Sequence, residues 1–274
     1  MNKKILIIGK KSFIGINLLK FFIKKKLKVH SINFENFIKD YDSFDNKFDF
    51  IINCTSNKPF IRNKYQNKND NDLIIAKKII YSNSKLVFIS TRKVYEPKFN
   101  IKENDKKKPT CNYSKNKLIS EQLVKKILIN RSLILRVSNI IGIPNKSKRK
   151  LHLTFLDIFF NKVKLGFIYD NKKIYKDFIS IKIFSEIIFQ LIKNDSTGVY
   201  NVSLGKKVYL NQLTKWLNFY NNKKLSLIKP QNNFNNDNFT LNNKKLMNKI
   251  DLKIRKNDLK NECLIISKKM FLKK

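Results

Sequence analysis

The chain has 274 residues, and its hydrophobic share of 42% is typical of a globular protein and excludes a disordered one. The longest apolar run, LHLTFLDIFF at 151–160, is too short to cross a membrane as a helix. The net charge of +39 suggests anionic ligands, but 53 of the 59 basic residues are Lys and 37 residues are Asn, which favours AT-rich codon usage over a nucleic-acid surface built on Arg.

The first half of the chain alternates short apolar runs with helical patterns. Five strands are predicted, at Ile5–Ile8, Lys28–Asn33, Phe48–Cys54, Leu86–Ser90 and Ser132–Val137. Helices are expected between them, near 13–25, 69–82 and 113–129. Continuous apolar strands separated by helices indicate a parallel sheet that is covered on both faces. We therefore predict an α/β protein with a doubly wound parallel sheet, which would bind ligands at the carboxyl ends of its strands.

After about residue 145 the pattern becomes less regular. A basic loop at 145–150 precedes a helix-like run, and short strands are predicted near 178–181 and 198–202. A helix pattern follows at 211–220, and the Asn-rich stretch 229–239 is predicted to be a loop. Only two histidines are present, His30 and His152, and they are far apart, so we predict no metal site.

The segment KILIIGKKSFIGINLLKFF reads as a strand, a tight turn and an apolar helix. Gly9 would let the chain turn sharply after the strand, and Gly15 would let the helix approach the sheet. The free N–H groups and partial positive charge of the helix N-terminus suit a pyrophosphate. The alternative is an ordinary strand–helix turn. We expect a dinucleotide to contact Gly9, Lys11, Ser12, Phe13, Ile14 and Gly15.

Two positions bear on the choice between NAD and NADP. Ser12 replaces the middle glycine of such loops, and its hydroxyl could donate to a phosphate. Asn33 stands at the end of the second strand, where a carboxylate would bind the ribose 2′-hydroxyl. Without that carboxylate a 2′-phosphate is not repelled, and Lys10 and Lys11 could pair with it. The cofactor is therefore expected to be NAD or NADP, with a slight preference for NADP.

A second motif combines Thr91, at a predicted strand end, with Tyr113 and Lys117 on the following helix. Four residues advance a helix by about 400°, so Tyr113 and Lys117 share one face within roughly 6 Å. An ammonium beside a phenol is expected to lower the pKa of that phenol, so that Tyr113 can exchange a proton with a carbonyl or hydroxyl oxygen. Thr91 could hold the same oxygen by a hydrogen bond. Chance occurrence is the alternative, since Tyr and Lys are common here.

Together these motifs resemble the extended short-chain dehydrogenase/reductases, which act on nucleotide-linked sugars and have a Rossmann-type fold. The resemblance covers residues 3 to about 205, and TLNNKKL at 240–246 is similar to a segment of dTDP-4-dehydrorhamnose reductases. The matching pieces are GKKSFIG (9–15), DFIINCTS (49–56), VFISTRKVYE (87–96), YSKNKLISE (113–121), LILRVSNIIG (133–142) and YKDFISI (175–181).

The resemblance implies roles for individual residues. Thr91, Tyr113 and Lys117 would be catalytic, and Lys117 would also hold the nicotinamide ribose. Asn53 would contact the cofactor. Asn139 and Lys176 would bind the substrate diphosphate. The alternative is that these two residues lie at the solvated surface and bind no substrate.

The same resemblance excludes one of the family's reactions. The 4,6-dehydratases of the family carry Asp-Glu directly after the threonine, but Arg92 and Lys93 stand here and cannot perform that elimination. Reduction of a keto-sugar is therefore favoured, with epimerisation of a nucleotide sugar as the alternative. A non-catalytic NAD(P)-binding regulator is a further alternative, against which the intact Thr, Tyr and Lys set argues.

Domain boundaries and partners follow as expectations. Residues 1–145 would form the dinucleotide-binding domain and 146–274 a smaller substrate-binding lobe, with part of 177–205 returning to the first domain. The odd number of cysteines and the absence of a signal-peptide pattern favour the cytoplasm. The substrate would be a nucleotide sugar, with no specific nucleic acid and no membrane as partner, and a homodimer is the assembly the resemblance suggests.

Overall fold

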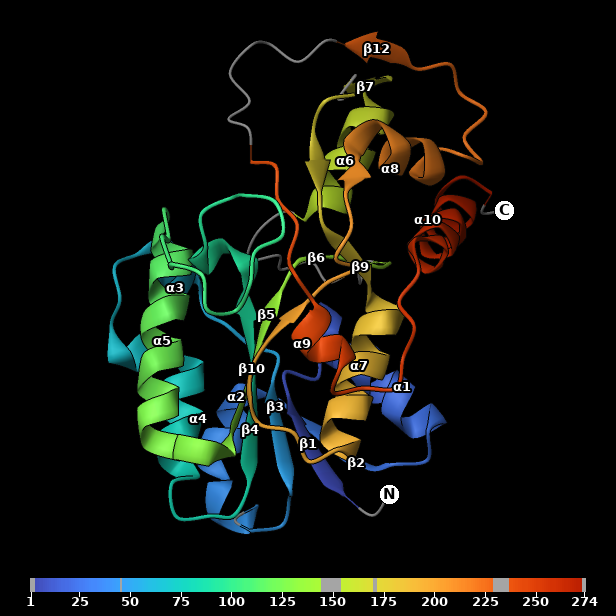
Figure 1. The fold of residues 1–274 in the computed structure, drawn as a ribbon. Coiled ribbons are helices and arrows are strands. Elements are labelled where there is room, and N and C mark those ends of the chain that lie inside the picture. The colour runs from blue at the N-terminus through green and yellow to red at the C-terminus, as the bar shows by residue number, and fades with distance from the viewer. Residues whose placement is uncertain (1–2, 45, 144–153, 170–171, 229–236, 273–274) are drawn as a thin grey trace.

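The structure is a computed structural model that describes residues 3–44, 46–143, 154–169, 172–228 and 237–272 (Figure 1). The basic loop expected at 145–150, the expected domain boundary at 145 and most of the Asn-rich stretch 229–239 lie outside the described residues.

A six-stranded sheet forms the centre of the larger half, in the order β10-β5-β4-β3-β1-β2. All of its strand pairs are parallel. The strands are β1 (Lys4–Ile8), β2 (Lys28–Ile32), β3 (Phe50–Asn53), β4 (Lys85–Thr91), β5 (Ser132–Val137) and β10 (Gly198–Val202). The prediction of a doubly wound parallel α/β sheet is confirmed.

Alternate residues of the strands point to opposite faces of this sheet, and each face is buried by helices. Ile5 and Ile7 of β1 belong to one core, and Leu6 and Ile8 belong to the other. The first core is completed by α1 (Phe13–Lys24) and α7 (Ile181–Lys193). The second is completed by α2 (Phe34–Lys39), α4 (Asn71–Lys78) and α5 (Asn112–Leu128). Figure 1 shows these two groups of helices on either side of the strands.

The second half has its own apolar core. It is built by α6 (Phe155–Lys164), α8 (Leu210–Leu217) and α10 (Lys256–Phe271). Three two-stranded sheets surround it: β6 (Asn139–Ile141) with β9 (Phe178–Ser180), β7 (Phe167–Tyr169) with β12 (Ser226–Ile228), and β8 (Tyr175–Lys176) with β11 (Val208–Tyr209). Two short helices, α3 (Lys58–Arg62) and α9 (Lys244–Met247), complete the described elements. No helix within the described ranges is both long and apolar enough to span a membrane.

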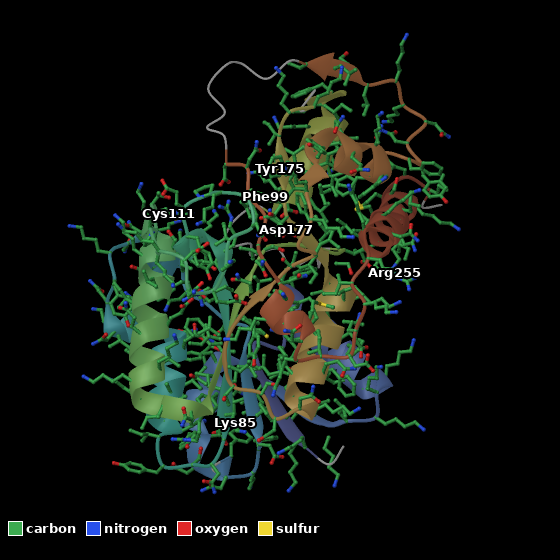
Figure 2. The ribbon with its side chains drawn as sticks, in the orientation of Figure 1. Lys85, Phe99, Cys111, Tyr175, Asp177 and Arg255 are labelled. Carbon is green, nitrogen blue, oxygen red and sulfur yellow. The ribbon has the colours of Figure 1, made fainter. Side chains whose placement is uncertain are left out.

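The strand order identifies where a ligand would bind. β1 lies between β2 and β3, so the chain leaves β1 to one side and returns on the other. In parallel sheets such a switch point forms a crevice at the carboxyl ends of the strands. These ends face the second half: Lys85, at the start of β4, lies at the opposite end of the larger half from Cys111, Phe99 and Asp177 (Figure 2).

Candidate active site

The turn after β1 brings two glycines into close contact at the switch point. Gly9 has a φ of +107°, and a Cβ placed on it would lie 2.8 Å from Cγ2 of Thr55, in the loop after β3. A Cβ on Gly15 would lie 2.2 Å from the carbonyl oxygen of Gly9. No larger side chain fits at Gly15 without a shift of the backbone, so the glycine spacing has a steric reason.

Ser12 begins helix α1 as its N-cap residue. Its Oγ accepts a hydrogen bond from the Gly15 amide at 2.9 Å, which leaves the hydroxyl proton available to a ligand. The amides of Phe13 and Ile14 lie in the first turn, where no acceptor exists within a helix. The narrow glycine turn and these first-turn donors fit a dinucleotide pyrophosphate.

Asn53, at the end of β3, is buried and supports the neighbouring loop. Its amide donates to Oδ1 of Asp72 at 2.7 Å, and its Oδ1 accepts from the amide and the hydroxyl of Thr55. Both functional groups of the side chain are therefore used inside the protein. Asn33 follows β2 at the same edge of the sheet, and its carbonyl oxygen accepts from Phe37 at the start of α2.

Thr91, Tyr113 and Lys117 lie on two elements that pack together. Thr91 ends β4 and is 9% exposed, and its Oγ1 accepts from the Lys93 amide at 3.2 Å. Helix α5 packs against β4 and the 3-10 turn Arg92–Val94 that follows it. Lys117 is buried on α5, with its Nζ 4.4 Å from the ring centre of Phe88, three residues before Thr91. The helix thus places Tyr113 and Lys117 beside the carboxyl end of β4.

Lys117 has a carboxylate partner that sequence reasoning missed. Its Nζ lies 2.8 Å from Oδ2 of Asp72, and both side chains are about 5% exposed or less. Burial acts to lower the pKa of Lys117, but the charges of Asp72 and Tyr113 and the hydrogen bond to Asp72 together outweigh it and hold that pKa above its ordinary value. Asp72 comes from α4, so this ion pair joins α4 to α5 and continues through Asn53 to the loop after β3.

The expected effect of Lys117 on Tyr113 is only partly correct. Burial raises the pKa of the Tyr113 phenol, and the Lys117 charge lowers it by a smaller amount. The Lys117 charge thus acts in the expected direction, but the net pKa of Tyr113 lies above its ordinary value. The physical reason is that removal of water from the phenolate outweighs a single ammonium whose charge Asp72 already balances.

The two residues expected to bind a diphosphate are both engaged by the protein. The side-chain amide of Asn139 donates to the backbone carbonyl oxygen of Asp177 at 3.2 Å. Lys176 directs its Nζ to Oδ2 of Asp237 at 2.8 Å. Lys176 is therefore not a free cation here, because an internal carboxylate occupies it.

Asp237 is shared with a second cation, Arg92. The Arg92 Nη2 lies 2.6 Å from the same Oδ2 atom, and its guanidinium carbon lies 3.9 Å from the ring centre of Phe239. Burial acts to raise the pKa of Asp237, but Arg92 and Lys176 outweigh it and hold that pKa below its ordinary value. Neither Arg92 nor Asp237 was predicted as a site residue.

The segment Asp237–Asn242, which forms an isolated bridge to Ile101 through Leu241, holds this cluster between the two halves. Its Leu241 amide donates to Oδ2 of Asp177, and its Thr240 carbonyl accepts from Ile101 in the loop after β4. Figure 1 shows this segment descending between the sheet and the second half toward α9.

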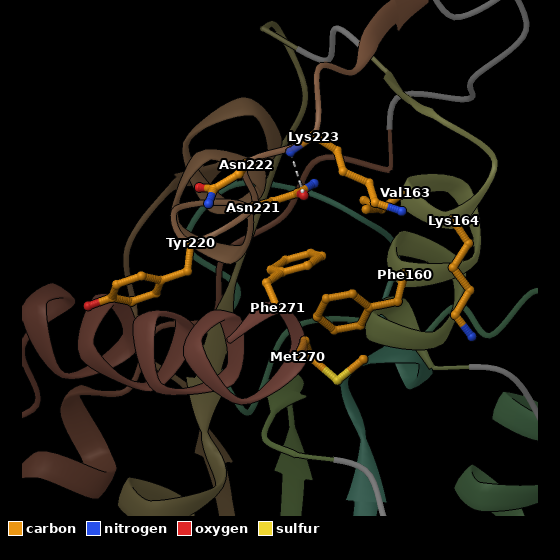
Figure 3. A pocket seen from close by; sticks show the side chains of 9 residues that line it. All are labelled: Phe160, Val163, Lys164, Tyr220, Asn221, Asn222, Lys223, Met270 and Phe271. Atoms are coloured by element: carbon orange, nitrogen blue, oxygen red, sulfur yellow. Dashed lines mark hydrogen bonds between the residues drawn. The ribbon is translucent and has the colours of Figure 1, made fainter. Parts of the chain in front are cut away.

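A separate cavity of about 400 Å³ lies in the second half (Figure 3). Phe160 of α6, Phe271 of α10 and Tyr220 line it, and no predicted site residue is among its lining residues. It is therefore not the candidate active site.

Comparison with known proteins places this geometry in a family. Residues 3–204 match the family model described as "RmlD substrate binding domain". The chain belongs to this family. The match includes every predicted site residue and ends before the segment that carries Asp237.

Solved structures of this fold match nearly the whole chain. A UDP-N-acetylglucosamine 4-epimerase from Methanobrevibacter ruminantium has a TM-score of 0.79 at 19% identity, covering 97% of each chain. A dTDP-4-dehydrorhamnose reductase ortholog from Clostridium acetobutylicum has a TM-score of 0.75 at 16% identity, over 97% of this chain and 99% of that one. WbmG from Bordetella bronchiseptica, in complex with NAD and UDP, has a TM-score of 0.75 at 18% identity, over 98% and 95%. The comparison with curated protein sequences finds no significant match.

Proposed function

We propose that the protein is an NAD(P)-dependent oxidoreductase that reduces a keto group of a nucleotide-linked sugar. The observation that carries this proposal is the position of Tyr113 and Lys117, one turn apart on a helix that packs beside Thr91. Thr91 and the glycine turn lie at the carboxyl ends of β4 and β1, two parallel strands that are separated by β3. Family membership supports a nucleotide-sugar substrate.

In this mechanism the chain's residues handle the proton and the orientation of the keto group. A bound nicotinamide supplies the hydride that reaches the carbonyl carbon. Thr91 donates a hydrogen bond to the carbonyl oxygen and holds it in place. Tyr113 donates its phenolic proton to the same oxygen, so that the carbonyl becomes an alcohol. Lys117 stabilises the phenolate that Tyr113 leaves behind, and Asp72 holds the Lys117 ammonium in position.

The family match favours reduction, because residues 3–204 fit the model described as "RmlD substrate binding domain". Epimerisation is the second candidate, since a UDP-N-acetylglucosamine 4-epimerase shares the fold. In that reaction Tyr113 would remove a proton from a sugar hydroxyl and return one to the transient ketone.

We also propose a cofactor preference, a cellular location and an assembly for the protein. A slight preference for NADP is supported by Asn33 at the end of β2 and by the exposed Lys10 and Lys11. A cytoplasmic location is supported by three free cysteines. The proposed partners are a nucleotide sugar and a second copy of the chain, without a nucleic acid.

The test is oxidation of NADPH and NADH in the presence of a panel of 4-keto nucleotide sugars. The wild-type protein should oxidise the cofactor stoichiometrically with one of them, whereas an epimerase would interconvert two sugars without net oxidation. Tyr113→Phe should lower turnover by about 100-fold or more while cofactor binding persists. Tyr81→Phe, which alters a tyrosine that is 95% exposed, is the control and should leave turnover unchanged. Turnover retained in Tyr113→Phe would refute this mechanism.

A further inference from the structure

Arg92 is fixed next to the candidate site by an ion pair and a ring contact. It directly follows Thr91, the residue proposed to hold the reacting oxygen, and its side chain is 7% exposed. The guanidinium lies 3.9 Å from the ring centre of Phe239. Phe239 is itself buried in a small apolar cluster with Val94, Tyr95, Ile101 and Leu241. A guanidinium stacked on a fixed ring keeps its orientation, so Arg92 presents its donors in a defined direction.

Among the residues that the structure describes, the charges around Arg92 do not balance. Arg92 and Lys176 share one oxygen, Oδ2 of Asp237, so two cations face one carboxylate. The buried Nε of Arg92 has no hydrogen-bond partner among the described residues. An unsatisfied buried donor on a charged group is unfavourable, and it becomes favourable once an anion accepts from it. A ligand anion that accepts from Nε as well as from Nη2 would therefore satisfy Arg92 more fully than Asp237 does, since Asp237 accepts from Nη2 alone.

We infer that Arg92 is a specificity-determining residue that binds a carboxylate on the sugar of the substrate, and that Asp237 takes the place of this carboxylate in the free protein. The inference rests on the proposed function and names its substrate class: nucleotide sugars that carry an acidic group. Two observations favour the sugar over the diphosphate. Arg92 adjoins the residue proposed to hold the reacting sugar oxygen, and the group that occupies the cluster is itself a carboxylate. The planar guanidinium matches a carboxylate through two parallel hydrogen bonds.

The experiment measures dissociation constants by calorimetry for pairs of ligands that differ only in sugar charge. UDP-glucuronic acid and UDP-glucose form one pair, the corresponding dTDP sugars form the second, and UDP and dTDP alone report the diphosphate. We call the dissociation constant of the neutral sugar nucleotide divided by that of the acidic one the ratio, and we expect it to be at least about 10 for one pair in the wild-type protein. Arg92→Gln should reduce the ratio to about one. Arg92→Lys should give an intermediate ratio, because it keeps the charge but loses the planar fork.

Lys93→Gln is the matched control. It removes the same charge from the adjacent, exposed residue, so it corrects for the general attraction of a protein with a net charge of +39. The control should keep the wild-type ratio. Asp237→Asn removes the internal carboxylate and should raise the ratio above that of the wild type; a ratio that falls or stays the same would contradict the place given to Asp237.

Several outcomes would overturn the inference. The first is a wild-type protein that binds the neutral and the acidic sugar nucleotide equally well. The second is a preference for the acid that persists in Arg92→Gln, or that Lys93→Gln loses to the same extent. The third is absence of binding in both nucleotide series. If Arg92→Gln weakens UDP or dTDP alone by the same factor as both sugars, Arg92 binds the diphosphate instead. The ratio is independent of turnover, so loss of the preference with turnover intact refutes only this inference. A preserved preference without turnover on any keto-sugar refutes only the proposed reaction.

Discussion

Lys117 and Asp72 form an ion pair of 2.8 Å that is closed off from solvent by α4, α5 and the end of β3. The pair determines how Lys117 can act beside Tyr113. Asp72 neutralises the Lys117 ammonium and also accepts a hydrogen bond from Asn53, so one carboxylate connects Lys117 to the loop proposed to bind the cofactor. The sequence motif of tyrosine and lysine is thus only part of a larger buried network.

Replacing Asp72 should destabilise the protein in a pH-dependent way. Asp72→Asn leaves Lys117 buried without a counter-charge, which should lower the free energy of unfolding at pH 7 by about 3–5 kcal/mol. The pKa of Lys117 is raised in the folded protein. Its stabilising contribution is therefore complete below the unfolded pKa of about 10.4 and is lost as the pH rises through the higher folded value. The difference between wild type and variant should shrink above that pH.

Urea unfolding of both proteins at pH 7 and in the alkaline range measures this effect. The control is Glu186→Gln, which removes a partly exposed partner of Lys25 and should cost about 0–1 kcal/mol. A loss in Asp72→Asn that is no larger than in the control would show that the buried pair does not stabilise the fold.

Gly15→Ala should impair cofactor binding by displacing the turn after β1. The new Cβ would lie 2.2 Å from the Gly9 carbonyl oxygen, so the turn or the helix must move. We expect the dissociation constant for NADPH, measured by fluorescence, to rise at least about tenfold. Gly166→Ala is the control: Gly166 has a φ of +84° and nothing within 4 Å, so its replacement should cost about 1–2 kcal/mol of stability and leave cofactor binding unchanged. Unimpaired binding in Gly15→Ala would argue against this cofactor site.

Asp177 should make the protein less stable as the pH rises through neutrality. Burial raises the pKa of Asp177 to about 7, even though the amides of Leu241 and Gly205 donate to its carboxylate. A folded pKa above the unfolded value of about 3.9 means that this contribution is complete below pH 4 and is lost as the pH rises through 7. Between pH 4.5 and pH 8 the wild type should lose about 3 kcal/mol relative to Asp177→Asn. Urea unfolding of both proteins at these two pH values measures the change, and a constant difference would contradict it.

The buried ion pair of Glu121 and Arg136 should help to hold α5 against β5. The Arg136 Nη2 lies 2.6 Å from Glu121, both side chains are 4% exposed or less, and Arg136 also donates to the Tyr95 hydroxyl. Glu121→Gln leaves this guanidinium without its carboxylate and should lower the free energy of unfolding by about 3–5 kcal/mol. Glu96→Gln is the control in the exposed pair with Lys108 and should produce no measurable change in urea. Equal effects of the two variants would contradict the assignment.

Much of the central sheet could be predicted from local pattern. The run Ile5–Ile8 is apolar at every position, as is typical of a strand buried on both faces. The run Ser132–Val137 is also buried throughout, and its core Leu133–Leu135 is apolar. Their predicted bounds agree with β1 and β5 to within one residue. Helix α7 was not predicted, although its residues Ile181, Phe184, Ile188 and Leu191 repeat at helical spacing. The signal was present there, and the irregular sequence around it obscured it.

The charged partners in the site could not be predicted in this way. Asp237 stands in an Asn-rich stretch that gives no periodic signal, and Arg92 is 145 residues earlier in the chain. Asp72 likewise pairs with a residue 45 positions away. Such contacts depend on how separate elements meet in space, and local propensity carries no information about that. The raised pKa of Tyr113 comes mainly from burial of its phenol, which likewise depends on how these elements pack.

The hydrogen bonds of the segment Asp237–Asn242 have a consequence for how the chain can be divided. This segment adjoins the loop after β4 and the β8–β9 connection at once, and Phe239 and Leu241 complete an apolar cluster with Val94 and Ile101. A fragment cut at residue 204, where the family match ends, would leave that cluster open to water. The C-terminal quarter of the polypeptide is thus a structural part of the catalytic half, and deleting it would be expected to yield an aggregating fragment in place of a minimal enzyme.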